Sequence, residues 1–458
     1  MVKIGLEVHV QLNTNTKLFC GCPNKFTNEP NTNVCEICMG FPGSKPRLNK
    51  KAFEYAIRIG LALNCKFPEE MFFSRKSYFY PDMPKNFQIT QYEVPLGKNG
   101  YLDSGEKKIG ITRVHMEEDP SRIVHIGSIT KAKYILVDDN RSGTPLCEIV
   151  TDPDFTSPKE ARIFLQKLSS ILEYLGVYDS SIEGSMRVDS NISVAETRVE
   201  IKNISGFKDV EKALNYEIIR QNNVLRRNGK IERETRGWDA GSGVTRSLRS
   251  KEQEEEYGYI FEPDLTRITL DRKMIGKIKS GLPELADEKV RRYEKMGIQK
   301  DLALAITSEP DLAEMFEEVI KKADAKLTAI WFGGELKKTL NFSNLRIKDT
   351  GIKPEHLIKL LKMIDEENIT VKSAEIMMRE MVKNPRDPET MTTNMERIHD
   401  EEVLSAMAKE VMSENVRAIL DYKAGKEEAF HFLVGQIMRK TKGRGDPETV
   451  RKVLRKLL

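Results

Sequence analysis

The chain has 458 residues, more than one hydrophobic core usually supports, which favours two or three domains. Its 39% hydrophobic and 31% charged residues are typical of a globular protein, and the absence of any apolar run of about 18 residues excludes a membrane protein. The first residues, "MVKIGLEVHV", lack the features of a secretory signal, so we expect a cytoplasmic protein.

The first predicted strand contains "GLEVHVQL" (residues 5–12). Side chains of a strand alternate between its two faces, so one face is apolar: Leu6, Val8, Val10 and Leu12. The other face is polar and carries Glu7, His9 and Gln11. The apolar face predicts a place in the core, and the polar face is either solvated or lines a site.

A cysteine cluster follows this strand. Two pairs, Cys20-x-Cys22 and Cys35-x-x-Cys38, are separated by twelve residues with Pro and Gly in the turns. Closely spaced cysteine pairs in a cytoplasmic protein favour one tetrahedral Zn²⁺ over disulfides, and four thiolates leave no open position for water. The spacing therefore predicts a structural zinc site, with four reduced thiols as the alternative. Cys65 and Cys147 have no spaced partners and are expected to be buried.

Three later segments also set a polar face against an apolar one. They are "GITRVHMEED" (residues 110–119), "MRVDSNIS" (186–193) and "TRVEIKNIS" (197–205). A sheet built from such strands would present carboxylates for Mg²⁺ and cations for a polyphosphate, although each face alone is more often solvated. The sequence has no Walker A motif, so an ATP site would be of another kind.

The organisation of the chain changes near residue 283. Before it, short alternating strands mix with helical patterns such as 157–176, where Ser157 is the expected N-cap and Gly176 the expected stop. After it, nearly every segment has helical period, and the two prolines of "KNPRDPETMTT" (383–393) predict a linker. We therefore expect an α+β domain over 1–290, a helical domain over 291–390 and a tail over 391–458.

The tail is basic although the formal charge of the whole chain is only +4. Residues 430–458 carry eight Lys/Arg against Asp446 and Glu448, a net +6, which leaves 4 − 6 = −2 for the rest. This distribution predicts a phosphate-rich partner at the tail, with a solvated helix surface as the alternative.

Several long, ordered blocks resemble the B subunit of tRNA-dependent amidotransferases (the GatB family). They include "IGLEVHVQL", "YFYPDMPKNFQITQYEVPLG", "GITRVHMEEDPSR", "DDNRSGTPLCEIVTDPD", "SMRVDSNIS", "EIKNISGF", "RSKEQEEEYGYIFEPDL" and "LPELADEKVRRY". The resemblance covers essentially the whole chain. A related archaeal-type E subunit has an inserted domain between its first part and its helical part. That domain is lacking here, because the segment "EPDLTRITLDRKMIGKIKSGLPELADEK" connects the two parts directly.

The resemblance implies an enzyme that repairs misacylated tRNA. Glutamate on the glutamine tRNA, or aspartate on the asparagine tRNA, is phosphorylated with ATP and then amidated with ammonia from an A (glutaminase) subunit, with a small C subunit joining the two. It also implies a cradle fold on an antiparallel sheet, similar to glutamine synthetase and guanidino kinases, and a C-terminal tRNA-binding domain. Because some members lack the four cysteines, the implied zinc is structural.

The same resemblance supplies the candidate site residues. His9, Glu118 and Glu148 resemble the Mg²⁺ ligands, and Glu7, Glu118, Lys76 and Lys202 are the catalytic candidates. Arg187, Asp189 and Asn191 are candidates for nucleotide or substrate binding. Two other functions remain open: a zinc-stapled RNA-binding scaffold without catalysis, and an ATP-dependent ligase that uses free ammonia on a small acid. Saturable ATP-dependent phosphorylation would separate the enzymes from the scaffold.

Overall fold

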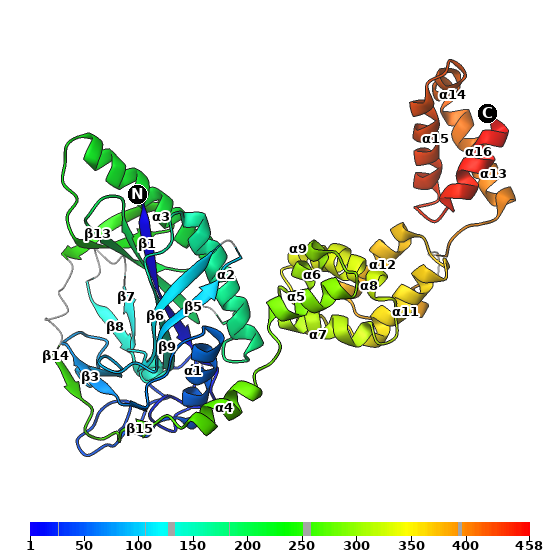
Figure 1. The fold of residues 1–458 in the computed structure, drawn as a ribbon. Coiled ribbons are helices and arrows are strands. Elements are labelled where there is room, and N and C mark those ends of the chain that lie inside the picture. Colours follow the sequence, from blue (N-terminus) through cyan, green and yellow to red (C-terminus); the bar gives the residue numbers. More distant parts are fainter. Residues whose placement is uncertain (26, 106, 127–132, 183, 251–257, 393–395) are drawn as a thin grey trace. The chain divides into compact units, whose positions relative to one another are not determined.

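The computed structural model describes residues 1–458 except 26, 106, 127–132, 183, 251–257 and 393–395 (Figure 1). The chain forms two compact units, Met1–Leu285 and Ala286–Leu458. The boundary precedes helix α5 (Ala286–Lys295), five residues before the expected end of the first domain at 290. The further division of the second part at residue 390 stays a prediction.

An eight-stranded sheet organises the first unit. Its order is β13 (Val244–Ser250), β12 (Glu234–Asp239), β11 (Val199–Ile204), β10 (Met186–Ser193), β1 (Lys3–Gln11), β9 (Pro145–Thr151), β6 (Lys108–Glu118) and β5 (Gly97–Asp103). Neighbouring strands are antiparallel except β11 and β12, which are parallel. The first strand of the chain therefore lies inside the sheet, between two strands from residues 145–193.

Smaller sheets and several helices complete the described part of this unit. The sheets pair β14 (Gly258–Phe261) with β3 (Ser74–Ser77) and β4 (Phe87–Thr90), β15 (Ile268–Thr269) with β2 (Glu70–Met71), and β7 (Arg122–His125) with β8 (Ile135–Asp138). The helices are α1 (Lys50–Ala62), α2 (Pro158–Tyr174), α3 (Phe207–Arg226) and α4 (Arg272–Ser280), with a 3-10 turn, η1 (Asp139–Arg141). The predicted α+β class is confirmed.

Helices α1, α2 and α3 pack on strands of the large sheet and cover one of its faces (Figure 1). Leu6, Val8 and Val10 of β1 point into this core and are at most 1% exposed. Full burial of each such side chain contributes roughly 1.5–3 kcal/mol. Helix α2 begins where predicted, because the Ser157 hydroxyl accepts a hydrogen bond from the Glu160 amide at 3.3 Å. The opposite, polar face of the sheet is left free of these helices.

The second unit is helical, as predicted. Its elements are α5, α6 (Lys300–Thr307), α7 (Pro310–Val319), α8 (Ala325–Trp331), the π-turn η3 (Phe332–Leu336), α9 (Lys337–Ser343), α10 (Ile347–Thr350), α11 (Pro354–Asp365), α12 (Val371–Lys383), η4 (Pro388–Met391), α13 (Glu401–Glu414), α14 (Val416–Lys423), α15 (Glu427–Lys440) and α16 (Pro447–Leu457). The methionines of α12 fill a core: Met377, Met378 and Met381 are fully buried. No helix within the described ranges is long and apolar enough to cross a membrane.

Candidate active site

The polar face of β1 lies at the centre of the candidate site. In the strand register His9 pairs with Glu148 of β9 on one side and with Arg187 of β10 on the other. Glu7 pairs with Asp189 of β10. Directly opposed residues of an antiparallel pair have Cβ atoms about 4.5–5.5 Å apart, so this register alone brings their side chains together.

The first cluster joins three strands. His9 Nδ1 lies 3.3 Å from Glu117 Oε1 and 3.9 Å from Glu148 Oε2. One ligand atom from each of the three residues lies within 4.8 Å of the others. His115 packs beside them, with Nε2 at 3.4 Å from Glu148 Oε2. Two carboxylates and an imidazole at this spacing form a donor set for a divalent cation.

Charge in this cluster is balanced by the protein itself. Burial by itself would lower the pKa of His9, but the hydrogen bond with Glu117 and the charge of Glu148 raise it to about 9. Burial likewise would raise the pKa of Glu117, and the hydrogen bonds with His115 and His9 hold it well below its usual range. The His9 imidazole therefore carries a proton at the nitrogen that a cation would bind. Binding of the cation would release this proton.

A second cluster of carboxylates lies beside the first. Glu7, Asp189 and Glu200 bring one oxygen each within 4.8 Å of the others. Lys202 Nζ lies 3.1 Å from Asp189 Oδ2, and the Asn191 amide donates to Glu7 Oε1 at 2.9 Å. Burial first, and then the charges of Glu148 and Asp189, raise the pKa of Glu7. A carboxyl group with a raised pKa is suited to accepting a proton near neutral pH.

Arg187 is held at the edge of this polar face. Its Nη2 donates to Asp119 Oδ1 at 2.7 Å, and Asp119 also lies 3.5 Å from Arg141 Nε. Arg187 is half-buried, whereas the Asp119 side chain is only 3% exposed. The guanidinium thus keeps a fixed place beside His9 with part of its surface accessible, as a phosphate contact would require.

The structure separates Glu118 from the residues with which the sequence grouped it. Its carboxylate forms an ion pair with Lys85 and accepts a hydrogen bond from the Ile89 amide at 2.9 Å. Successive residues of β6 point to opposite faces of the sheet, so Glu117 and not Glu118 joins His9 and Glu148. The structure thus sets Glu117 beside His9 and Glu148, and a role of Glu118 as a cation ligand stays a prediction.

Lys76 does not lie on the large sheet. It belongs to β3 of the three-stranded sheet, where it pairs in register with Gln88 and Tyr259, and its Nζ lies 5.7 Å from the centre of the Tyr78 ring. The remaining candidates, Glu7, His9, Glu148, Arg187, Asp189, Asn191 and Lys202, share the polar face of the large sheet.

The sequence analysis did not select three residues of these clusters as candidate site residues: Glu117, His115 and Glu200. The missing signal for the first two was the period of the strand, since His115 and Glu117 are two residues apart and share a face. Glu200 shares a face with Lys202 for the same reason, and the β10–β11 register sets it opposite Asn191.

The four cysteines of the zinc prediction converge. Their Sγ atoms lie within 4.8 Å of one another, as a common metal ion requires. The Cys35 amide donates to Cys38 Sγ at 3.1 Å, and the Lys17 ammonium lies 3.7 Å from the same sulfur. The hydrogen bond from the Cys20 thiol is the main cause that lowers the pKa of Cys38 to about 5 and raises that of Cys20. Cys65 and Cys147 are buried, as expected.

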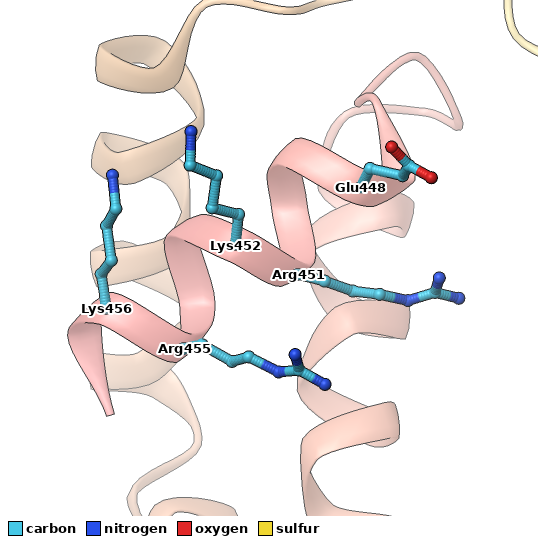
Figure 2. Close-up of a pocket in the computed structure, with 5 residues that line it drawn as sticks. All are labelled: Glu448, Arg451, Lys452, Arg455 and Lys456. Atoms are coloured by element: carbon cyan, nitrogen blue, oxygen red, sulfur yellow. The ribbon is translucent and has the colours of Figure 1, made fainter.

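A separate basic surface lies on α16. Arg451, Lys452, Arg455 and Lys456, with Glu448, line a shallow pocket of about 480 Å³ (Figure 2). Figure 2 shows the two lysines projecting to one side of the helix and the two arginines to the other. Lys456 Nζ lies 3.0 Å from Glu401 Oε2, and Lys452 pairs with the same carboxylate. The Arg455 guanidinium packs over the Phe430 ring at 5.5 Å.

Comparison with known proteins identifies the family. The GatB/GatE catalytic domain model matches residues 2–276, and the GatB domain model matches residues 314–458. The chain belongs to the GatB family. Relatives named as the B subunit of aspartyl/glutamyl-tRNA(Asn/Gln) amidotransferase include those of Carboxydothermus hydrogenoformans, 46% identical over 99% of this chain and 97% of the relative, and of Methanosarcina barkeri, 47% identical over 100% and 98%. The Thermotoga maritima relative is 43% identical over 99% and 98%. Both clusters on the large sheet and the four cysteines lie inside the matched catalytic domain of GatB.

Proposed function

We propose that this chain is the B subunit of a tRNA-dependent amidotransferase, which activates the side-chain carboxylate of glutamate or aspartate on misacylated tRNA. Amidation of misacylated tRNA is the function of the GatB family, and full-length relatives carry the name of that component. The observation that carries the catalytic part is the convergence of His9, Glu117 and Glu148 beside Glu7, Asp189 and Lys202 on one polar face.

The reaction needs activation because a carboxylate has no good leaving group. An oxygen of the substrate carboxylate attacks the γ-phosphorus of ATP, the bond to the β,γ-bridging oxygen breaks, and ADP leaves. Ammonia then adds to the acyl carbon, a proton is lost, and inorganic phosphate leaves with its electron pair. The product is glutaminyl- or asparaginyl-tRNA, with the amide nitrogen derived from glutamine by the A subunit.

The residues of the polar face suit these steps. His9, Glu117 and Glu148 would hold a divalent cation, for which we propose Mg²⁺; when bound, it offsets charge on the transferring phosphoryl group. Arg187 and Lys202 supply positive charge for phosphate or substrate oxygens, and Asp189 and Asn191 orient them. We propose that Glu7, whose pKa is raised, takes the proton that attacking ammonia loses.

The four cysteines are proposed to hold a structural zinc. Four sulfurs complete a tetrahedral coordination sphere and leave no position for substrate. The ion would join the loop after β1 to the turn that carries Cys35 and Cys38. We assign it no step of the reaction.

The partners and the remaining domains follow from the family. We propose that the chain works with A and C subunits, and that its tail binds the tRNA through the basic surface of α16. We also infer that the first unit belongs to the cradle class of glutamine synthetase and guanidino kinases. A tail domain over 391–458 is supported by the separate hydrophobic core of α13, α15 and α16.

The test is phosphoryl transfer by the assembled enzyme. The complex, given misacylated tRNA, γ-labelled ATP, Mg²⁺ and glutamine, should produce labelled phosphate and amidated tRNA. Glu117→Gln should reduce this conversion by a factor of about a hundred or more, whereas Glu196→Gln, in an exposed bend, should not change it. If tRNA binds but ATP is never consumed, the chain is an RNA-binding scaffold and the enzymatic proposal fails.

A further inference from the structure

Lys17 is a buried lysine whose environment is unusual. It is 0% exposed, and its Nζ donates to the backbone oxygen of Asn33 at 2.8 Å and to Cys38 Sγ at 3.7 Å. Within the described part of the chain no carboxylate forms an ion pair with it. A buried ammonium is costly unless an anion or strong acceptors surround it.

The fold holds Lys17 in this place from several sides. Asn33, whose oxygen accepts from Lys17, is itself fixed because its amide donates to Asn140 Oδ1 at 2.7 Å. Gly143 adopts φ +85° and closes over Lys17: a Cβ there would lie 3.5 Å from Lys17 Cδ and 3.4 Å from Cys38 Cβ. Both side chains are buried: Lys17 is 0% and Cys38 is 3% exposed.

The charge of the neighbouring cysteines decides what Lys17 can do. Four thiolates around one divalent cation carry a net charge of 4 × (−1) + 2 = −2, part of which a buried cation can balance. A buried ammonium in contact with one of these sulfurs therefore matches the charge of the metal-loaded cluster.

We propose that Lys17 is a positioning and charge-balancing residue of the four-cysteine site, whose buried ammonium stabilises the thiolate–metal cluster through Cys38. The inference rests on the proposed zinc site and goes beyond it, because it names a residue that is not a ligand yet sets the affinity. Groups that contact metal ligands from outside commonly change metal affinity by about 10–100-fold.

The first measurement is zinc affinity of the full chain by competition with a chromophoric chelator. Lys17→Met, which keeps the length of the side chain and removes its charge, should weaken zinc binding by about tenfold or more. Lys25→Met removes the same charge from an exposed position near the cluster and should not change the affinity. Unchanged affinity in Lys17→Met overturns the proposal. Failure of the wild-type chain to bind zinc overturns the metal site itself.

The second measurement separates charge balance from ordinary packing. Hydrogen exchange of residues 17–40 is followed with zinc bound and after its removal. Lys17→Met should lose more protection relative to wild type in the zinc form than in the metal-free form, because the charge that it removes balances the loaded cluster. A variant that loses protection equally in both forms would show a packing role only. If Lys17→Met does not fold, Lys17→Arg decides: retained affinity supports the role of charge, and a loss of about tenfold or more contradicts it.

Discussion

Glu117 and Glu118 are neighbours in β6, yet their carboxylates meet different partners. Glu117 Oε1 lies 3.3 Å from His9 Nδ1 in the cation cluster, whereas Glu118 forms an ion pair with Lys85. The Lys85 and Glu118 side chains are 7% and 4% exposed. The two carboxylates therefore lie in different environments, and we expect Glu117 to act in the site and Glu118 to stabilise the structure around it.

The Lys85–Glu118 pair should behave as a buried ion pair. Replacing one partner leaves the other charge buried, so Glu118→Gln and Lys85→Met should each lower the free energy of unfolding by about 3 kcal/mol. The double variant should lose less than the sum of the two, because no charge is then left alone. Urea unfolding of the four proteins, followed by a probe in the first unit, measures this coupling. Additive losses would contradict it.

The side chains of His9, Glu117 and Glu148 predict which divalent ion this cluster prefers. An imidazole favours Mn²⁺ over Mg²⁺, so the wild-type chain should bind Mn²⁺ about tenfold or more tightly than Mg²⁺. His9→Gln replaces the imidazole by an oxygen donor and should reduce this ratio, mainly through weaker Mn²⁺ binding. Titration of Mn²⁺ by electron paramagnetic resonance, with Mg²⁺ as the competitor, gives both constants. An unchanged ratio in His9→Gln would place the ion elsewhere.

Asp446 gives the tail a pH-dependent element. Its carboxylate caps α16 by accepting from the Thr449 amide at 2.8 Å, and Arg397 Nε lies 3.1 Å from its other oxygen. Burial alone would raise the pKa of Asp446, but the hydrogen bonds from Thr449 and the pair with Arg397 lower it to about 2.

Because the folded pKa lies below the ordinary value of 3.8, this stabilisation is present above pH 3.8 and is lost as the pH falls through about 2. Asp446→Asn should therefore expose the first turn of α16 to faster hydrogen exchange at pH 7, equivalent to about 1 kcal/mol. The difference from wild type should shrink as the pH approaches 2. A difference that grows on acidification would reverse the assigned sign.

The four basic side chains of α16 should contribute to tRNA binding as two unequal pairs. Lys452 and Lys456 are partly neutralised by Glu401, whereas Arg451 and Arg455 project to the other side of the helix (Figure 2). Each alanine replacement of an arginine should weaken tRNA binding and lower the slope of log K against log[salt] by about 1, and each lysine replacement should do less. Glu401→Gln should strengthen binding because it frees both lysines. Equal effects of all four alanine variants would show that Glu401 does not matter.

Much of the site was predictable because it depends on local alternation. The period of two in "GLEVHVQL" correctly separates the core face of β1 from the face that carries Glu7 and His9. The same rule, applied to "RVHMEED", would have selected Glu117 over Glu118, whereas motif resemblance alone does not distinguish adjacent glutamates. Spacing also sufficed for the cysteines, since short pairs on turns converge without long-range information.

What the sequence did not reveal is the order of the strands. Glu7, Asp189 and Glu200 meet only because β1 lies beside β10 and β10 beside β11, and no local pattern specifies that order. The place of Lys76 in a different sheet has the same cause. The first compact unit ends at Leu285, within five residues of the expected boundary, because the segment with Gly281 and Pro283 separates α4 from α5.

The position of β1 has a consequence for synthesis on the ribosome. Its two neighbours, β9 and β10, are made more than 130 residues later. Both edges of the nascent first strand are therefore unpaired until residue 151 has emerged, and one edge until residue 193 has emerged. Exposed edges of an apolar strand invite pairing with other chains. Fragments that end before residue 145 should therefore aggregate or require a chaperone, while those that extend past β11 can close the sheet.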